Sequence, residues 1–184
     1  RGAGIRSAER ITDEEVKEFI GEPPVRENLL KSLEENKPIT IGSLDLQDYY
    51  FEHKRQEVEA MKNVKSVFKE ICKEYKEISG RDYSYLETYM LDDAEYAMVV
   101  MSSTAGTVKE VVDELRKEGK KVGLLKIKLF RPFPYEEVAE ILNKVKNIAV
   151  LDRSISFGAE PPLFSEIKSA MYNNNKVNIS SYIS

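Results

Sequence analysis

The stretch YAMVVMSSTAG, residues 96–106, contains the pattern that decides the fold. Its first part, residues 96–101, is a short and nearly continuous apolar run, which is typical of a parallel strand buried on both faces. Small and hydroxyl-bearing residues follow, and then apolar residues recur at helical spacing at Val108, Val111, Val112 and Leu115. A buried strand that leads directly into an amphipathic helix predicts the first repeat of an α/β domain.

The same alternation continues towards the C-terminal end of the chain. Further strands are predicted at residues 122–130, 148–151 and 177–179, with helical patterns between them. Repeated strand–helix units form parallel sheets with right-handed crossovers and helices on both faces. Residues 91–184 are therefore predicted to form an α/β domain, a three-layer sandwich with a mostly parallel sheet in which the strand at 96–101 is central.

Residues 1–90 have a different, helical character. Thr12 and Glu15 form a capping-box pattern at the start of a short helix. A long helix is predicted from about Asp48 to Ser79, because apolar residues recur every three or four positions there, and Gly80 is placed to end it. We interpret this part as a helical linker segment with a docking role.

Composition excludes several classes of protein. The chain has 184 residues and a net charge of −4, with 28 basic and 32 acidic side chains, so it lacks the basic excess of a nucleic-acid-binding protein. No apolar run approaches the roughly 18–20 residues that a membrane span needs. Neither nucleic acid nor membrane is expected as a partner.

The chain has one cysteine, Cys72, and one histidine, His53. A single cysteine permits no disulfide within the chain and no iron–sulfur cluster held by it, and zinc sites built on several His or Cys ligands are excluded. An unpaired thiol indicates a reducing compartment, so we expect a cytoplasmic protein. No metal site and no cofactor are predicted within this chain.

The best candidate site follows the strand at 96–101. Small residues between a strand and a helix let backbone amides approach a ligand, and a helix N-terminus favours an anion. This candidate site consists of Ser103, Thr104, Ala105 and Gly106. It is neither a Walker loop nor a GxGxxG motif, and simple capping of the helix by Ser or Thr is the competing interpretation.

Two other segments are predicted to share this edge of the sheet, because the carboxyl ends of parallel strands meet there. Asp152 and Arg153 follow the strand at 148–151, and Arg131 follows the strand at 122–130. They are candidates for an anion or ligand site or for an interface with a partner. An Asp–Arg pair that orders a loop, and an Arg131 that fixes its own loop, are the competing interpretations.

His53 lies beside three aromatic residues, Tyr49, Tyr50 and Phe51. Histidine titrates near neutral pH and could act as a base. However, no nucleophile or paired carboxylate has a spacing that would complete a catalytic arrangement with it. We expect an aromatic anchor that is buried against a partner or a core. No catalytic residue is predicted anywhere in the chain.

Several motifs together resemble the alpha subunit of pyruvate:ferredoxin oxidoreductase, also called pyruvate synthase. They occur in the family's order and extend from about residue 9 to about residue 172. The motifs are KPITIG (37–42), DYYFEHKRQ (48–56), EAM (59–61), GRDY (80–83), DDAEY (92–96), STAGT (103–107), RPFP (131–134) and LDRSISFG (151–158).

The resemblance implies that the chain is the C-terminal part of such a subunit. Residues 1–90 would be the linker that follows a thiamine-diphosphate pyrimidine-binding domain, and residues 91–184 would be a domain similar to the C-terminal domain of transketolases. The intact enzyme would use thiamine diphosphate, magnesium and iron–sulfur clusters, all held by other domains or subunits. Its partners would be beta, gamma and ferredoxin-like delta subunits, and ferredoxin would accept the electrons.

The resemblance also implies a reaction, the conversion of pyruvate and CoA to acetyl-CoA and CO₂, to which this part would contribute scaffold and interface. Two alternatives remain open. One is a sibling enzyme acting on 2-oxoisovalerate or 2-oxoglutarate, although the DYYFE run favours pyruvate. The other is a stand-alone module that binds an anion at residues 103–106.

The sequence departs from the family pattern at two positions. Ser102 stands where the family usually has glycine, and its side chain would narrow the approach of a ligand to the backbone. Pro161 replaces a residue with an amide, which stiffens its loop and removes a donor.

Overall fold

The computed structural model describes residues 11–21, 42, 44–174 and 176–183. The chain divides into two compact units between Tyr83 and Ser84. The motif at residues 37–42, apart from Gly42, lies outside the described residues.

The first unit contains two helices, α1 (Asp13–Ile20) and α3 (Gln47–Ser79). The predicted capping box is present, since the Thr12 side chain accepts from the Glu15 amide and the Glu15 carboxylate accepts from the Thr12 amide. Gly80 ends α3 in the left-handed conformation, as predicted. The helix predicted to start at about Asp48 begins one residue earlier: its cap residue is Leu46, without a side-chain hydrogen bond, and Asp48 lies in the first turn.

The apolar stripe of α3 is only partly covered. Cys72 is buried, which agrees with a small core residue, and Phe19 of α1 packs edge-on against Tyr75 with ring centroids 5.7 Å apart. Ile71, on the same stripe, is 44% exposed. Apolar side chains that stay exposed along a long helix indicate a surface that can pack against a further protein surface.

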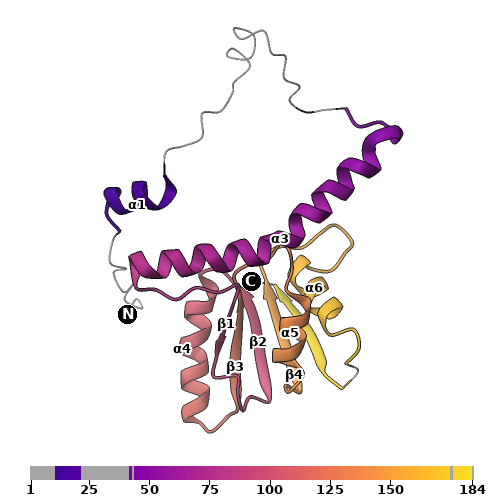
Figure 1. Ribbon diagram of the computed structural model, residues 1–184. Coiled ribbons are helices and arrows are strands. Elements are labelled where there is room, and N and C mark those ends of the chain that lie inside the picture. Colours follow the sequence, from indigo (N-terminus) through magenta and orange to yellow (C-terminus); the bar gives the residue numbers. More distant parts are fainter. Residues whose placement is uncertain (1–10, 22–41, 43, 175, 184) are drawn as a thin grey trace, which may run out of the picture. The chain divides into compact units, whose positions relative to one another are not determined.

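The second unit is built on a five-stranded sheet with the order β1-β3-β2-β4-β5 (Figure 1). Strand β2 is central and pairs in parallel with both β3 and β4. Strand β5 extends the sheet in parallel, whereas β1 pairs antiparallel with β3 at the other edge. The strands are β1 (Leu86–Tyr89), β2 (Tyr96–Met101), β3 (Val122–Ile127), β4 (Asn147–Asp152) and β5 (Asn178–Ile183).

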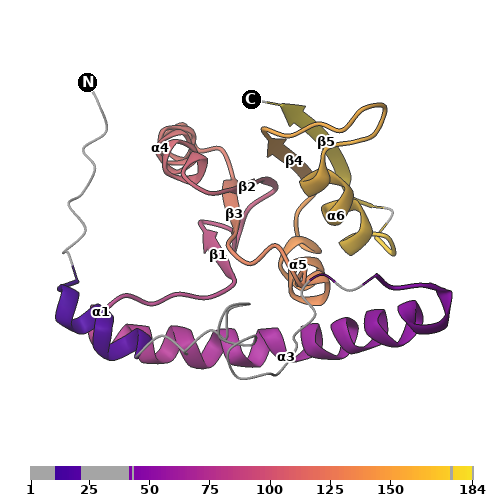
Figure 2. The same ribbon diagram turned by 90° about the horizontal axis from the view of Figure 1, so that it is seen from above.

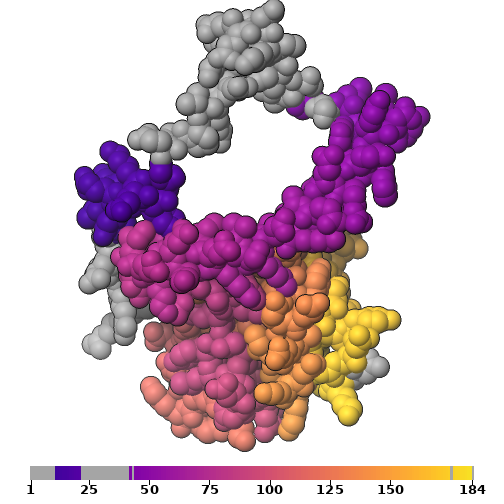
Figure 3. All heavy atoms as spheres, in the orientation of Figure 1, coloured from indigo at the N-terminus to yellow at the C-terminus, as the bar shows by residue number. Residues whose placement is uncertain are grey.

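Helices cover both faces of the sheet (Figure 2). Helix α4 (Thr104–Lys117) packs on one face, and its buried residues Val108 and Val112 join a cluster with strand residues Val100 and Leu124. Helices α5 (Tyr135–Leu142) and α6 (Pro162–Ala170) pack on the opposite face over the larger core cluster. In the space-filling view, side chains occupy the space between the ribbons of α4, α5 and the strands (Figure 3). The predicted α/β class, with three layers and a mostly parallel sheet, is confirmed.

The sheet unit begins earlier than the predicted start at residue 91. Residues 86–89 form edge strand β1, although the sequence analysis placed them in the linker segment. This strand is short and contains a glutamate and a threonine, so no apolar run marks it. The second predicted strand is also shorter than expected, because it ends at Ile127 and residues 128–130 form a connection.

Gly123 is required by the close packing of the turn between β1 and β2. A Cβ atom at this position would lie 2.5 Å from the carbonyl oxygen of Met90 and 2.8 Å from Cδ2 of Leu91. Real Cβ atoms do not approach backbone atoms so closely, and a backbone carbonyl cannot move aside cheaply. The absence of a side chain near the start of β3 therefore makes room for the turn between β1 and β2.

We expect Gly123→Ala to lower the free energy of unfolding by about 1–3 kcal/mol, because the added methyl group overpacks this contact. Gly106→Ala is the matched control, since a Cβ there meets nothing within 4 Å. That substitution lies in helix α4 and should stabilise the protein by about 0.5–1 kcal/mol. Denaturant unfolding of both variants checks the prediction, and equal effects would contradict it.

A cluster of partly buried ion pairs joins β1, α4 and the connection that follows β3. The Glu87 carboxylate pairs with Lys109 of α4 and with Lys128, the latter at 2.7 Å. Burial alone would raise the pKa of Glu87, but hydrogen bonds from the two lysines outweigh burial and lower the pKa from 4.5 to about 2. The edge strand is thereby tied to its neighbours.

The lowered pKa makes stability depend on pH. The ionised Glu87 stabilises the fold above its ordinary pKa of 4.5, and this stabilisation is lost as the pH falls through about 2. Glu87→Gln should therefore be less stable than wild type by about 1–2 kcal/mol at pH 7, with the difference shrinking between pH 4.5 and 2. The exposed pair of Glu118 with Lys120 provides the control, and Glu118→Gln should differ little from wild type at any pH. A Glu87→Gln deficit that is the same at pH 7 and pH 2 would contradict this prediction.

Candidate functional site

Strands β2 and β4 lie side by side, and their chains leave the sheet in opposite directions. After β2 the chain enters α4 on one face, and after β4 it enters α6 on the other (Figure 2). Open α/β sheets form a crevice at such a point, and it is where they usually bind ligands. A cavity of about 160 Å³ lies here, lined by Met101, Ser102, Ser103, Thr104, Leu151, Asp152, Arg153 and Leu163.

Only part of the predicted loop faces this cavity. Ser103 and Thr104 line it, whereas Ala105 is 1% exposed within the core under α4. The amides of Ala105 and Gly106 donate to the chain's own carbonyls, those of Ser102 and Ser103. These two amides are therefore not directed at a ligand. Ser103 is the cap residue of α4, but its hydroxyl makes no capping hydrogen bond, so the competing interpretation as a side-chain cap is wrong for it.

Ser102 has a positive φ of 57°. This left-handed conformation costs a residue with a side chain roughly 1 kcal/mol or more, whereas glycine adopts it freely. Serine at residue 102 thus occupies a backbone conformation suited to glycine, and this lowers the stability of the fold locally.

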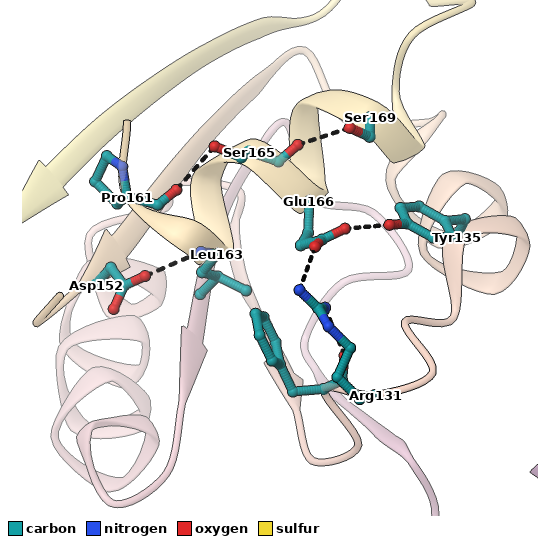
Figure 4. A network of polar contacts seen from close by, with 9 residues as sticks. Arg131, Tyr135, Asp152, Pro161, Leu163, Ser165, Glu166 and Ser169 are labelled. Atoms are coloured by element: carbon teal, nitrogen blue, oxygen red, sulfur yellow. Dashed lines mark hydrogen bonds and ion pairs between the residues drawn. The ribbon is translucent and has the colours of Figure 1, made fainter. Parts of the chain in front are cut away.

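Asp152 has a structural role at the cavity. Its Oδ2 accepts from the amide of Leu163 at 3.0 Å (Figure 4). Its Oδ1 accepts from the amide of Ser154, also at 3.0 Å. Because Pro161 and Pro162 have no N–H, the Leu163 amide is the first that α6 presents. A carboxylate at this helix N-terminus is also favoured by the helix dipole. The first amide of α6 is therefore satisfied by the chain itself.

The predicted alternative of an Asp–Arg pair is not what orders this loop. Asp152 orders it through backbone amides, and Arg153 is exposed at the cavity. Among the described residues, no carboxylate lies within ion-pair distance of the Arg153 guanidinium. The Asp152 carboxylate thus accepts hydrogen bonds from the backbone, whereas the Arg153 guanidinium has no carboxylate partner among the described residues.

Arg131 does not line the cavity with the other candidate residues. Its guanidinium pairs with Glu166 of α6 at 2.6 Å and stacks on the Phe130 ring, 4.1 Å from the centroid (Figure 4). The Tyr135 hydroxyl donates to the same carboxylate, which raises the pKa of Tyr135. Arg131 therefore fixes the connection after β3 to α6, as the competing interpretation proposed. The roles of Glu166 and Tyr135 were not predicted, since nothing in their local sequence marks them.

His53 and its aromatic neighbours are exposed rather than buried in a core. The His53 Nδ1 lies 2.6 Å from Oδ1 of Asp45, which precedes α3. Tyr49, Tyr50 and Phe51 are all more than half exposed. The described residues of the first unit form no core around these side chains, and burial against a partner stays a prediction.

The residues present do not fit the cofactors that the family resemblance implies. A cluster held by several thiolates cannot form on the single, buried Cys72. Within residues 11–21, 42, 44–174 and 176–183, no group of three His, Cys, Asp or Glu side chains is placed to hold a metal ion. In the same described ranges, no helix is long and apolar enough to span a bilayer.

Comparison with known proteins agrees with the fold. Residues 94–184 match the family model for pyruvate:ferredoxin oxidoreductase core domain II. Pyruvate synthase subunit PorA of Thermotoga maritima is 54% identical over 92% of this chain and 42% of its own length. Ketoisovalerate oxidoreductase subunit VorA of Pyrococcus horikoshii is 46% identical over 89% of this chain and 41% of its own.

A solved structure of 2-oxoglutarate:ferredoxin oxidoreductase from Magnetococcus marinus, with 2-oxoglutarate, coenzyme A and succinyl-CoA bound, is also similar. Its TM-score is 0.42 and its identity 19%, over 55% of this chain and 17% of that one.

The fold and the family match define a core domain of an oxidoreductase subunit. The chain belongs to the pyruvate:ferredoxin oxidoreductase family, which confirms the resemblance seen in its motifs. It spans about two-fifths of the length of the two relatives described above.

Substitution of the two charged cavity residues, Asp152 and Arg153, tests their different contributions to stability. Asp152→Ala should lower the free energy of unfolding by about 1–2 kcal/mol, because the first amide of α6 loses its acceptor. Arg153→Ala should change it by less than about 0.5 kcal/mol, because the side chain is exposed. Denaturant unfolding checks both. Equal losses in the two variants would contradict the assignment of the structural role to Asp152 alone.

Proposed function

We propose that this chain is the part of a pyruvate:ferredoxin oxidoreductase alpha subunit that supplies scaffold and interface. The single observation that carries the proposal is the 54% identity to a pyruvate synthase subunit over 92% of the chain. The assembled enzyme would convert pyruvate, CoA and oxidised ferredoxin to acetyl-CoA, CO₂ and reduced ferredoxin. Residues 1–90 would connect the sheet domain to a thiamine-diphosphate-binding domain.

In this proposal the chain itself supplies no catalytic residue. The hydrogen bonds of Asp152, Arg131 and Glu166 hold loops and helices together, which supports a structural role for these side chains. Thiamine diphosphate, magnesium and iron–sulfur clusters would be held by other domains or subunits. The beta, gamma and ferredoxin-like delta subunits would be the partners, ferredoxin would be the electron acceptor, and the unpaired Cys72 thiol favours the cytoplasm.

A ketoisovalerate oxidoreductase is the second candidate, because VorA is 46% identical over 89% of the chain. The identity to the pyruvate enzyme is higher, and this difference favours pyruvate as the substrate. An anion-binding module is disfavoured by the cavity, where the Asp152 carboxylate already occupies the start of α6 and would repel a second anion.

The substrate is tested with the complete subunit assembled with its partners. The rate of viologen reduction is measured with pyruvate, 2-oxoisovalerate and 2-oxoglutarate in turn, with CoA present throughout. We expect the highest kcat/KM for pyruvate. A higher value for 2-oxoisovalerate would assign the chain to the sibling enzyme, and the absence of activity with all three would contradict the proposal.

A second measurement addresses the scaffold role. Calorimetric titration of this chain alone with thiamine diphosphate and Mg²⁺ should show no binding, because no described cluster can hold the metal–diphosphate group. Binding in the micromolar range would contradict the view that the cofactor is held elsewhere.

A further inference from the structure

One face of the sheet is covered over only part of its width. On strand β4, Ile148 and Val150 are buried in the larger core cluster. Ala149 and Leu151 alternate with them and line a groove on the other face. On β5, Tyr182 pairs in register with Leu151, so it lies on the groove's face, and it is 54% exposed. Among the described residues of the sheet unit, no helix covers β4 and β5 on this face, which we call the uncovered half.

The groove at the uncovered half is apolar. It has a volume of about 290 Å³ and is lined almost entirely by apolar groups of α4 and the strands, among them Val111 of α4, which is 46% exposed. Strands β2, β4 and β5 pair in parallel, and parallel sheets occur almost only where both faces are covered. This half of the face is therefore expected to be covered in the complete protein.

The right-handedness of crossovers explains why this half is uncovered. The chain crosses the sheet in one direction from β2 to β3 through α4. It crosses in the opposite direction from β3 to β4 through α5 and from β4 to β5 through α6. Right-handed connections that run in opposite directions place their helices on opposite faces, as Figure 2 shows. Because one connection runs in the first direction and two in the other, α4 alone lies on its face in the sheet unit.

The same rule gives the position of a helix that follows β5. The edge strand β5 ends beside β4, where Ile183 pairs with Asp152 and Tyr182 with Leu151 at one end of the groove. A chain that returns from β5 towards β4 moves in the direction of the β2-to-β3 connection, so right-handedness places it on the face of α4. Helix α6 already packs against the opposite face. A helix after β5 thus has the uncovered half available to it.

The charges at the far end of the groove fit a helix of this direction. At the amino ends of the strands the groove joins a hollow that carries Lys120 and Lys121, and Tyr96 lines both. The carboxylate in that hollow, Glu95, already pairs with Lys146. A helix that returns from β5 runs antiparallel to the strands, so its C-terminus, the negative end of the helix dipole, lies towards these lysines.

We propose that, in the complete subunit, an amphipathic helix that follows β5 in the same polypeptide packs into the groove beside α4 and covers β4 and β5. About 13 residues would span the face, because the six residues of β4 extend over about 20 Å and a helix rises 1.5 Å per residue. The relatives are long enough for such a segment, since this chain matches 42% of PorA and 41% of VorA. This inference rests on the proposed function, since it assigns the chain to a longer alpha subunit.

A photocross-linking experiment identifies the occupant in the complete subunit, produced without its partner subunits and kept dilute. Val111→p-benzoylphenylalanine places a photoreactive group at the groove. Tyr172→p-benzoylphenylalanine is the matched control, since Tyr172 is 81% exposed and does not line the groove. We expect position 111, but not position 172, to cross-link to a peptide of the same chain that follows residue 184.

A second measurement does not depend on the bulky photoreactive group. In the complete subunit, Val111→Lys should lower the midpoint of thermal unfolding by at least about 3 °C, because the helix would bury the added charge. In a subunit that stops after Ser184, the same substitution should shift the midpoint by less than about 1 °C, since Val111 is then exposed.

Each other outcome would overturn the inference in favour of a different occupant. Cross-links from position 111 to residues 1–83 or to polypeptide that precedes them would assign the groove to the N-terminal side of the subunit. Cross-links to another subunit that form only on assembly, or to a second copy at high concentration, would assign it to those partners. Equal midpoint shifts by Val111→Lys with and without the segment after Ser184 would also contradict it. Viologen reduction by the wild-type assembly reports on the proposed function separately.

Discussion

The Asp152 carboxylate, bound to the amides of Ser154 and Leu163, is the interaction on which the rest of the site depends. Two consecutive prolines make the Leu163 amide the first N–H of α6, and Asp152 accepts from it. This one side chain closes the loop between β4 and α6 and positions α6 over the core. It also places a negative charge where a doubly wound sheet would otherwise receive an anionic ligand.

The consequence is a sheet edge at which several charged side chains hold loops and helices in place. Arg131, Glu166 and Tyr135 link the connection after β3 to α6, so the side chains on that side of the edge are committed to one another (Figure 4). By contrast, Arg153 has no carboxylate partner among the described residues, and the Phe157 ring is exposed. A family in which subunits assemble can use such a domain as a rigid platform.

The α/β class and the central position of β2 could be predicted because a strand buried on both faces leaves a continuous apolar run. Strand β1 could not, since it is a short edge strand whose Glu87 pairs with Lys109 of α4 and with Lys128 just after β3. The shared edge of residues 103 and 152 followed from parallel topology. The separation of Arg131 from that edge did not, because it depends on Glu166, a partner distant in sequence.

Hydrogen–deuterium exchange of the complete subunit, alone and assembled, tests most directly whether Asp152 orders this edge before assembly. The Leu163 amide should be protected in both states, because Asp152 holds it in the free subunit. Rapid exchange at Leu163 in the free subunit, with protection that appears only on assembly, would contradict an edge that the chain orders by itself.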